Sequence, residues 1–301
     1  MIRTRINAVL TASQQDEFFR LGYLHLPAMV PAPLLDRLKQ LFEDLMDLDK
    51  DLDERTVYEY KGKNYVTNLE NVCRKGNLAA LELLGYPKIL EIAQLICGDD
   101  FFLIQEFAVN KTLGDELPVL WHKDMPHERM GRCFTMGIYL DDADENDGAL
   151  RVVPGSHISH KGICELSKEP FIEVPVKAGD ILIHDMLLAH SSAPLQRNSI
   201  RRVLYFEFLS AAHVKAENIY SDELVKRRSR LLYTATRLYA SLHPEEKQFV
   251  HPKENPELED KFKEIETILK EIYCQPTRAR PSEYCLNHLG QAPELFKAPL
   301  L

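Results

Sequence analysis

The chain has 301 residues, of which 45% are hydrophobic and 28% are charged, and its formal net charge is −9. This length and apolar content can supply one large core, or one core with helical additions. The acidic balance argues against nucleic acid or an anionic membrane as the main partner, because phosphate binding requires a concentrated basic surface. No window of the sequence approaches the ~20 apolar residues of a membrane span.

The cysteines and the N-terminal residues indicate in which cellular compartment the protein is expected. Six cysteines, at positions 73, 97, 133, 164, 274 and 285, show no CxxC spacing, and we interpret them as reduced thiols. Cys97 and Cys133 lie in apolar stretches and are expected in the core. The first fifteen residues hold two arginines and no acid, as transit peptides do, but their apolar run is too short for a secretion signal. We therefore expect a cytoplasmic protein.

The first hundred residues are mainly helical in pattern. Apolar residues at helical spacing predict helices over 13–22, 33–48, 77–84 and 87–97. Ser13 is the expected N-cap of the first helix, and the YLHLPA segment after it alternates like a strand. A charged run at 47–55 is expected to form a helix end and a solvated loop.

From residue 101 the pattern changes to short β-prone runs separated by turn residues. The runs are FFLIQEFAV, PVLWH, RCFTMGIYL, ALRVV, FIEVPV, DILIHDMLLAH and RRVLYFEFL. Seven or eight short strands at this spacing are typical of an all-β sandwich or barrel. Helical periodicity returns over 222–242 and 257–273. We predict one domain: N-terminal helices and strands over 1–100, a β-core over 101–211 and a C-terminal helical extension over 212–301.

Three side chains of the β region form a candidate metal site. His122 and Asp124 follow the apolar run PVLW, and residues i and i+2 of a strand point to the same face. His190 ends the run DILIHDMLLAH, 66 residues beyond Asp124. Two imidazoles and one carboxylate make the facial triad of non-haem Fe(II) oxygenases, with positions left open for a co-substrate and O₂. An HxD pair alone is a weak signal, so the prediction depends on all three residues.

The residues around His190 refine this interpretation. His184 competes for the ligand role, but its place inside an apolar strand favours a core histidine or one that supports the ligands. Arg201 lies 11 residues past His190. A guanidinium can hold the distal carboxylate of 2-oxoglutarate with two parallel hydrogen bonds, which an ammonium cannot. Arg202, on the opposite face, is interpreted as a surface strand residue.

The segments WHKD, LDDADENDGALRVVPGSH and AGDILIHDMLLAHSSAPLQRNSIRR resemble the phytanoyl-CoA dioxygenase family of Fe(II)/2-oxoglutarate-dependent oxygenases. The resemblance is strong over 101–210 and loose over the N-terminal helices. It implies a double-stranded β-helix, the cupin-like jelly roll, as the core. It also implies a role for eight residues: iron ligands at His122, Asp124 and His190, a 2-oxoglutarate anchor at Arg201, co-substrate contacts at Ser192 and Gln105, and lining positions at Thr135 and Lys111.

The sequence departs from the family pattern at two places. HKD replaces the usual HQD, and HSS replaces HGS. Lys123 is expected to point away from its ligand neighbours if the strand is regular, and Ser191 is expected to alter the local loop only. The acids at 141–147 and His157 are interpreted as parts of a structural turn.

The predicted activity is oxidation of a C–H bond in a small or medium organic metabolite, with O₂ consumed and 2-oxoglutarate converted to succinate and CO₂. Halogenation is set aside, because related halogenases vacate the carboxylate position that Asp124 fills. Two alternatives remain: a non-catalytic jelly-roll binding or sensing protein, and a metal-dependent cupin-type enzyme that does not use 2-oxoglutarate. The substrate mouth is expected at 58–71 and at the loop with Met125, His127 and Arg129.

Overall fold

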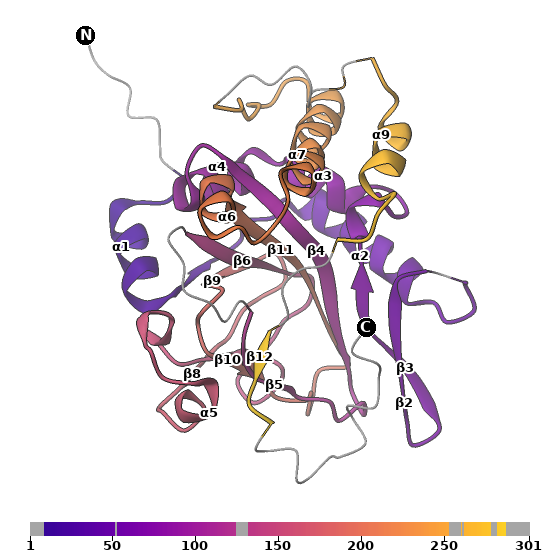
Figure 1. The fold of residues 1–301 in the computed structure, drawn as a ribbon. Helices are drawn as coiled ribbons and strands as arrows, with labels where there is room; N and C mark the ends of the chain where they lie inside the picture. Colours follow the sequence, from indigo (N-terminus) through magenta and orange to yellow (C-terminus); the bar gives the residue numbers. More distant parts are fainter. Residues whose placement is uncertain are drawn as a thin grey trace.

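The computed structural model describes residues 9–51, 53–124, 132–252, 260, 262–277 and 282–286. Two antiparallel β-sheets pack against each other, and most helices cover the outer face of the larger sheet (Figure 1). This arrangement confirms the predicted class, a mostly β jelly-roll core with flanking helices. The loop that contains Met125, His127 and Arg129 lies outside the described residues.

The larger sheet has seven strands with β11 in the middle. In spatial order they are β1 (Tyr23–Leu26), β9 (Ile181–Asp185), β6 (Cys133–Tyr139), β11 (Ile200–Ser210), β4 (Phe101–Thr112), β3 (Lys63–Glu70) and β2 (Arg55–Tyr60). Alternate residues of β11 serve two cores. Leu204 and Phe206 face the helices, whereas Val203 and Tyr205 face the smaller sheet. Burial on both faces explains why RRVLYFEFL is a nearly continuous apolar run.

The smaller sheet has five short strands. In spatial order they are β12 (Glu283–Tyr284), β5 (Val119–Lys123), β10 (His190–Ser192), β7 (Leu150–Val152) and β8 (Ile172–Val174). The pairing of β5 with β10 puts His190 directly opposite His122. The run DILIHDMLLAH is therefore two strands, β9 in the larger sheet and β10 in the smaller one.

The helices of the described chain mostly shield the outer face of the larger sheet, with one short exception beside β5 and β12 of the smaller sheet. They are α1 (Ala12–Leu21), α2 (Ala32–Met46), α3 (Ala79–Gly85), α4 (Pro87–Cys97), α5 (Ile163–Leu166), α6 (Ala211–Glu217), α7 (Asp222–Leu242) and α9 (Ile265–Ile272), with 3-10 turns η1 (Val72–Arg74) and η2 (Ser156–Ile158). A buried ion pair between Arg228 of α7 and Glu106 of β4 joins the two layers. Arg228 Nε also donates to the Leu103 carbonyl at 3.0 Å.

Several local predictions need correction. The N-cap of α1 is Thr11, not Ser13, because Thr11 and Gln14 form a reciprocal capping box. In the charged run at 47–55, the described residues before Arg55 lie outside helices and strands, as expected, but the hairpin of β2 and β3 over 55–70, which extends the larger sheet, was not predicted. Of the predicted 257–273 helix, only Ile265–Ile272 is helical among the described residues; 260 and 262–264 are not helical, and 257–259 and 261 lie outside the described residues.

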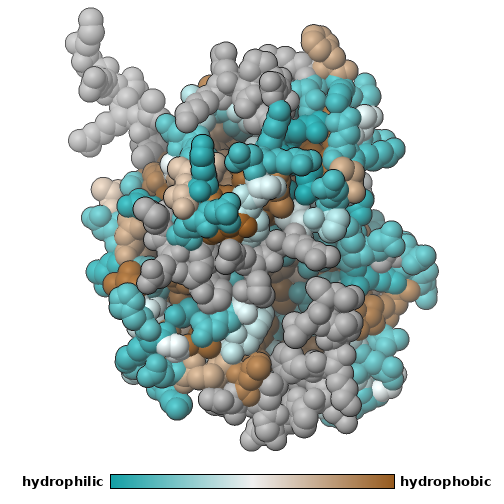
Figure 2. Space-filling model, in the orientation of Figure 1, coloured by the Kyte–Doolittle hydropathy of each residue, from teal (hydrophilic) through white to brown (hydrophobic). Residues whose placement is uncertain are grey.

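Hydrophilic residues cover most of the described surface on the face shown in Figure 2. Within the described ranges, no helix combines the length and the hydrophobicity needed to cross a membrane.

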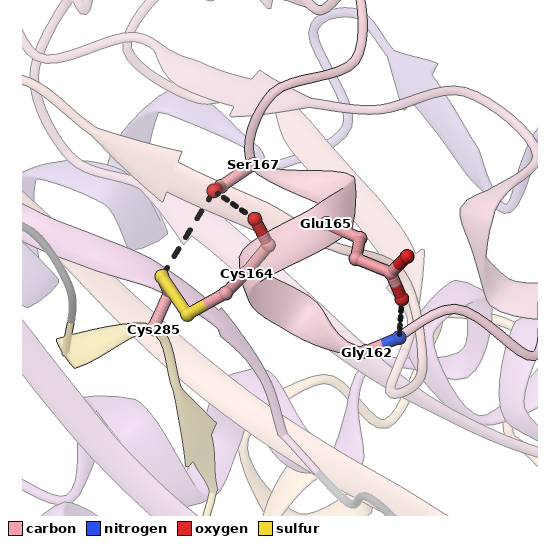
Figure 3. The surroundings of a disulfide bond; sticks show 5 residues. All are labelled: Gly162, Cys164, Glu165, Ser167 and Cys285. Atoms are coloured by element: carbon pink, nitrogen blue, oxygen red, sulfur yellow. Dashed lines mark hydrogen bonds between the residues drawn. A yellow bond between two sulfur atoms is a disulfide. The ribbon is translucent and has the colours of Figure 1, made fainter.

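One cysteine pair contradicts the prediction that all six are reduced thiols. Cys164 of α5 and Cys285, directly after β12, form a disulfide across 121 residues (Figure 3). The backbone N–H of Cys285 also donates to the Trp121 carbonyl at 2.9 Å, so the segment is held to β5 as well. Cys97 and Cys133 are buried and form no disulfide, as expected. Sequence spacing could not reveal the bond, because its partners meet only through the tertiary fold.

We expect Cys285→Ser to lower the free energy of unfolding by about 2–4 kcal/mol, since the disulfide restricts a long loop in the unfolded chain. Urea unfolding in non-reducing buffer measures this. Cys274→Ser, at an exposed free thiol, is the matched control and should change stability by less than about 0.5 kcal/mol. Equal stability of Cys285→Ser and the wild type would contradict the prediction.

Candidate metal centre

Three side chains from neighbouring strands of the smaller sheet meet at one point. His122 of β5 and His190 of β10 are cross-strand partners, and Asp124 directly follows β5. One potential ligand atom of each lies within 4.8 Å of the others. Asp124 Oδ1 is 3.4 Å from His122 Nε2 and 3.6 Å from His190 Nε2. The structure thus brings together the three residues predicted from the sequence, and this donor set fits Fe(II) with open coordination positions.

Both imidazoles are oriented by backbone carbonyls. His122 Nδ1 bonds to the Leu120 carbonyl at 2.8 Å, and His190 Nδ1 bonds to the Leu188 carbonyl at 2.9 Å. A carbonyl oxygen only accepts, so Nδ1 carries the proton and the lone pair of the neutral ring lies on Nε2. Burial, with the neighbouring His122, lowers the pKa of His190 and favours the neutral form that a metal ligand requires.

Asp124 is fixed by two side-chain donors on its second oxygen. Thr135 Oγ1 donates to Asp124 Oδ2 at 2.8 Å, and His184 Nε2 lies 3.1 Å from the same atom. Oδ1 therefore remains directed at the two ligand histidines. Burial opposes ionisation, but the neighbouring imidazoles, His190 first and then His122 and His184, hold the pKa of the Asp124 carboxyl well below its ordinary value.

Arg201 gives the cavity beside the triad a positive end. Its side chain lines the same cavity as the three ligand residues and Ser192. Arg201 is 1% exposed, and its Nε and Nη1 have no hydrogen-bond partner in the described structure. Ser192 Oγ lacks a partner as well. Burying a guanidinium without an acid is costly, so these unpartnered donors fit the carboxylate of a ligand.

Arg202 corrects the prediction of a surface residue. It faces away from Arg201, as expected, but it is only 6% exposed and forms a two-point ion pair with Asp141 at 2.8 and 2.9 Å. The turn at 141–147 is structural, as predicted: Asp147 accepts hydrogen bonds from the backbone of residues 196–198. His157 Nε2 likewise contacts the Phe19 carbonyl at 3.1 Å.

The other predicted residues lie outside the set that lines the cavity. Lys111 is the cross-strand partner of Arg201, but its Nζ donates to the Leu117 carbonyl at 2.7 Å and to the Ser192 carbonyl at 3.4 Å. Gln105 pairs with Glu207, six residues further along β11 than Arg201. Lys123 Nζ donates to the Lys161 carbonyl at 3.1 Å, away from the ligands, as expected.

Three residues near the site were missed from the sequence. The Tyr284 ring of β12 stacks on His122, with centroids 4.8 Å apart and an interplanar angle of 16°. No sequence signal marks Tyr284, because β12 has two residues and lies far from β5 along the chain. Glu207 and the cavity-lining Tyr205 could have been predicted from the sequence, since alternation along β11 puts 205 and 207 on the same face as Arg201.

The comparison with known proteins agrees with this geometry. The family model for phytanoyl-CoA dioxygenase (PhyH) matches residues 18–203, more than half of the chain. Methylphosphonate hydroxylase of Gimesia maris is 26% identical over 242 residues, which cover 74% of this chain and 89% of the relative. L-proline trans-4-hydroxylase of Streptomyces griseoviridis is 29% identical over 156 residues, which cover 50% of this chain and 55% of the relative.

The structure of EctD from S. alaskensis, solved with 2-oxoglutarate and 5-hydroxyectoine, superposes with a TM-score of 0.60 and 20% identity. The match covers 69% of this chain and 79% of that one, and at this identity it shows a common fold. Family match, fold and site geometry agree: the chain belongs to the phytanoyl-CoA dioxygenase family and is an Fe(II)/2-oxoglutarate-dependent dioxygenase.

Proposed function

We propose that His122, Asp124 and His190 hold the iron of this enzyme and that Arg201 and Ser192 bind the distal carboxylate of 2-oxoglutarate. One observation carries the proposal. Two proton-free imidazole nitrogens and a carboxylate oxygen converge beside a buried guanidinium that has no acidic partner in the described structure. An enzyme without 2-oxoglutarate has no use for that guanidinium, and a binding protein has no use for an open triad.

Each residue has a physical task in this scheme. Bound Fe(II) with 2-oxoglutarate supplies O₂ activation and oxidation of a C–H bond, with release of succinate and CO₂. Thr135 and His184 keep Asp124 Oδ1 directed at the metal position. The apolar side chains of Phe107, Val109 and Tyr205 line the cavity and exclude water from it.

The substrate is proposed as a small organic molecule. The names of the relatives specify methylphosphonate and L-proline, which differ in charge and shape, so the family alone does not select one. We also propose a cytoplasmic location. Cellular thiols would reduce the Cys164–Cys285 disulfide there, so at least part of the pair should be in the reduced form. Thiol trapping in fresh cell extract tests this, and a fully oxidised pair would contradict it.

Anaerobic protein with Fe(II) and 2-oxoglutarate should show a weak visible charge-transfer band, because the 2-oxo acid chelates ferrous iron. Absorbance titration and calorimetry measure it. Protein that contains iron but remains colourless and binds no 2-oxoglutarate would overturn the proposed function.

Arg201→Ala and Arg201→Lys should weaken 2-oxoglutarate binding by about 2–5 kcal/mol, because a charge-assisted pair in a closed site is lost. Iron binding should change much less. Arg202→Ala is the matched control: it should lower the free energy of unfolding by about 3–5 kcal/mol, because Asp141 loses its partner, while the folded fraction keeps its affinity for 2-oxoglutarate. If Arg202→Ala weakened 2-oxoglutarate binding and the Arg201 variants did not, the face of β11 that carries Arg202 would be the one that faces the co-substrate.

Asp124→Ala should reduce 2-oxoglutarate turnover by at least about 100-fold, since the metal loses an anionic ligand. Asp124→Glu should also fail in large part, because its extra methylene displaces the oxygen. Steady-state succinate formation and iron content are measured, with circular dichroism as the folding control. Asp142→Ala, at an acid paired with Lys177 on the surface, should behave like the wild type. Near wild-type turnover by Asp124→Ala at full iron loading would mean that another carboxylate holds the metal.

A further inference from the structure

A row of side chains crosses four strands of the larger sheet beside the triad. The strand register aligns His184 with Thr135, Thr135 with Glu207, and Glu207 with Gln105. His184 and Thr135 both contact Asp124 Oδ2, so this row lies at the metal centre. Cross-strand neighbours have Cβ atoms about 4.5–5.5 Å apart. Glu207 is therefore one strand away from a residue that touches an iron ligand.

Glu207 differs from every other buried acid of the described chain. Those acids all have donors: Glu82 has Arg37 and His243, Glu106 has Arg228, Asp180 has His25, and Asp115 and Asp147 have backbone N–H groups. Glu207 is 8% exposed, and no described residue forms a hydrogen bond or an ion pair with it. A buried carboxyl without a donor is costly, and the other buried acids of the described chain avoid that cost.

A second carboxyl lies close to Glu207. Glu70, at the end of β3, is the cross-strand partner of Phe107, which lines the cavity. Burial and the charges of Glu106 and Glu54 raise the pKa of Glu70 to about 7, and Gln105 contacts its side chain. Burial and the charges of Asp124 and Glu70 raise the pKa of Glu207 well above its ordinary value. Lys75 is the cation that acts on Glu70, and burial together with the acidic neighbours outweighs it.

Positive charge gathers at the opposite end of the same face. Arg201 lies six residues back along β11, about 20 Å at strand spacing, and its cross-strand partner Lys111 lies beside it on β4. The inner face of the sheet therefore runs from a guanidinium without an acid, past the metal centre, to a carboxyl without a base. A 2-oxoglutarate dianion fits the first end. The second end requires a ligand of opposite charge.

We propose that Glu207, with Glu70 beside it, binds a cationic nitrogen of the primary substrate, a protonated amine or an amidine, and so places neighbouring C–H bonds at the metal. The inference rests on the proposed function, because it takes the triad as the iron site and Arg201 as the co-substrate anchor. An anionic substrate would gain nothing at this end. A neutral polyol is the competing class, since carboxyls also bind hydroxyl groups.

The test uses the full chain, anaerobic, loaded with Fe(II) and 2-oxoglutarate, and three probes of similar size. These are pyrrolidine, which is cationic at neutral pH, cyclopentanol, which is neutral, and methylphosphonate, which is anionic. Binding is measured by calorimetry and by the shift that each probe causes in the visible band. Pyrrolidine should bind at least tenfold more tightly than the other two.

Glu207→Gln keeps the size of the side chain and removes the carboxylate. It should weaken pyrrolidine binding at least tenfold and abolish the preference over cyclopentanol, and Glu70→Gln should have a smaller effect of the same sign. Glu59→Gln, at an exposed glutamate of β2, is the matched control and should keep the preference. The visible band is recorded first for each variant, so that only loaded protein is compared.

The outcomes separate the two proposals. A wild-type protein without the band refutes the proposed function itself. A band with equal or tighter binding of cyclopentanol refutes the cationic class, and tighter binding of methylphosphonate refutes it as well. A preference for pyrrolidine that survives in Glu207→Gln shows that Glu207 does not recognise the cation.

Discussion

The metal centre depends on one pairing, that of β5 with β10. This pairing puts His190 opposite His122, and the i, i+2 alternation of the strand puts Asp124 on the face of His122. Backbone carbonyls two residues before each histidine then bond its Nδ1, so the same short strands set both the position and the tautomer of the ligands. A shift of one residue in this register would turn His190 away from Asp124, and no side chain could compensate.

The two faces of the central strand β11 have different roles: one borders the metal centre, and the other packs against the scaffold. Arg201, Tyr205 and Glu207 face the smaller sheet, whereas Arg202 and Phe206 face the helices or the turn that packs there. Arg201 and Arg202 show what this means for adjacent residues of one type. Arg202 has a permanent partner in Asp141 and contributes to stability, while Arg201 has no acidic partner in the described structure and can bind the carboxylate of a ligand.

Much of the site was predictable because its signals are local. The triad, Arg201 and the opposite orientation of Lys123 follow from alternation and from short spacings within one region of sequence. Contacts made through the tertiary fold were not. The bond between Cys164 and Cys285 and the stacking of Tyr284 on His122 join segments that the sequence separates widely. The burial of Arg202 was missed for a similar reason, since its acid lies 61 residues away.

Unpaired buried charge distinguishes the inner face of β11, which borders the metal centre, from the rest of the scaffold. Buried ionic groups such as Glu106 with Arg228 are neutralised within the chain, which makes the scaffold stable without a ligand. In the described structure, Arg201 is a buried guanidinium without an acid and Glu207 a buried carboxyl without a base, and both lie on the inner face of β11. Their separation along one rigid strand keeps two ligands apart. A carboxylate at Arg201 and a cation at Glu207 would each gain at one end alone, so the charge pattern orients both relative to the metal before any chemistry begins.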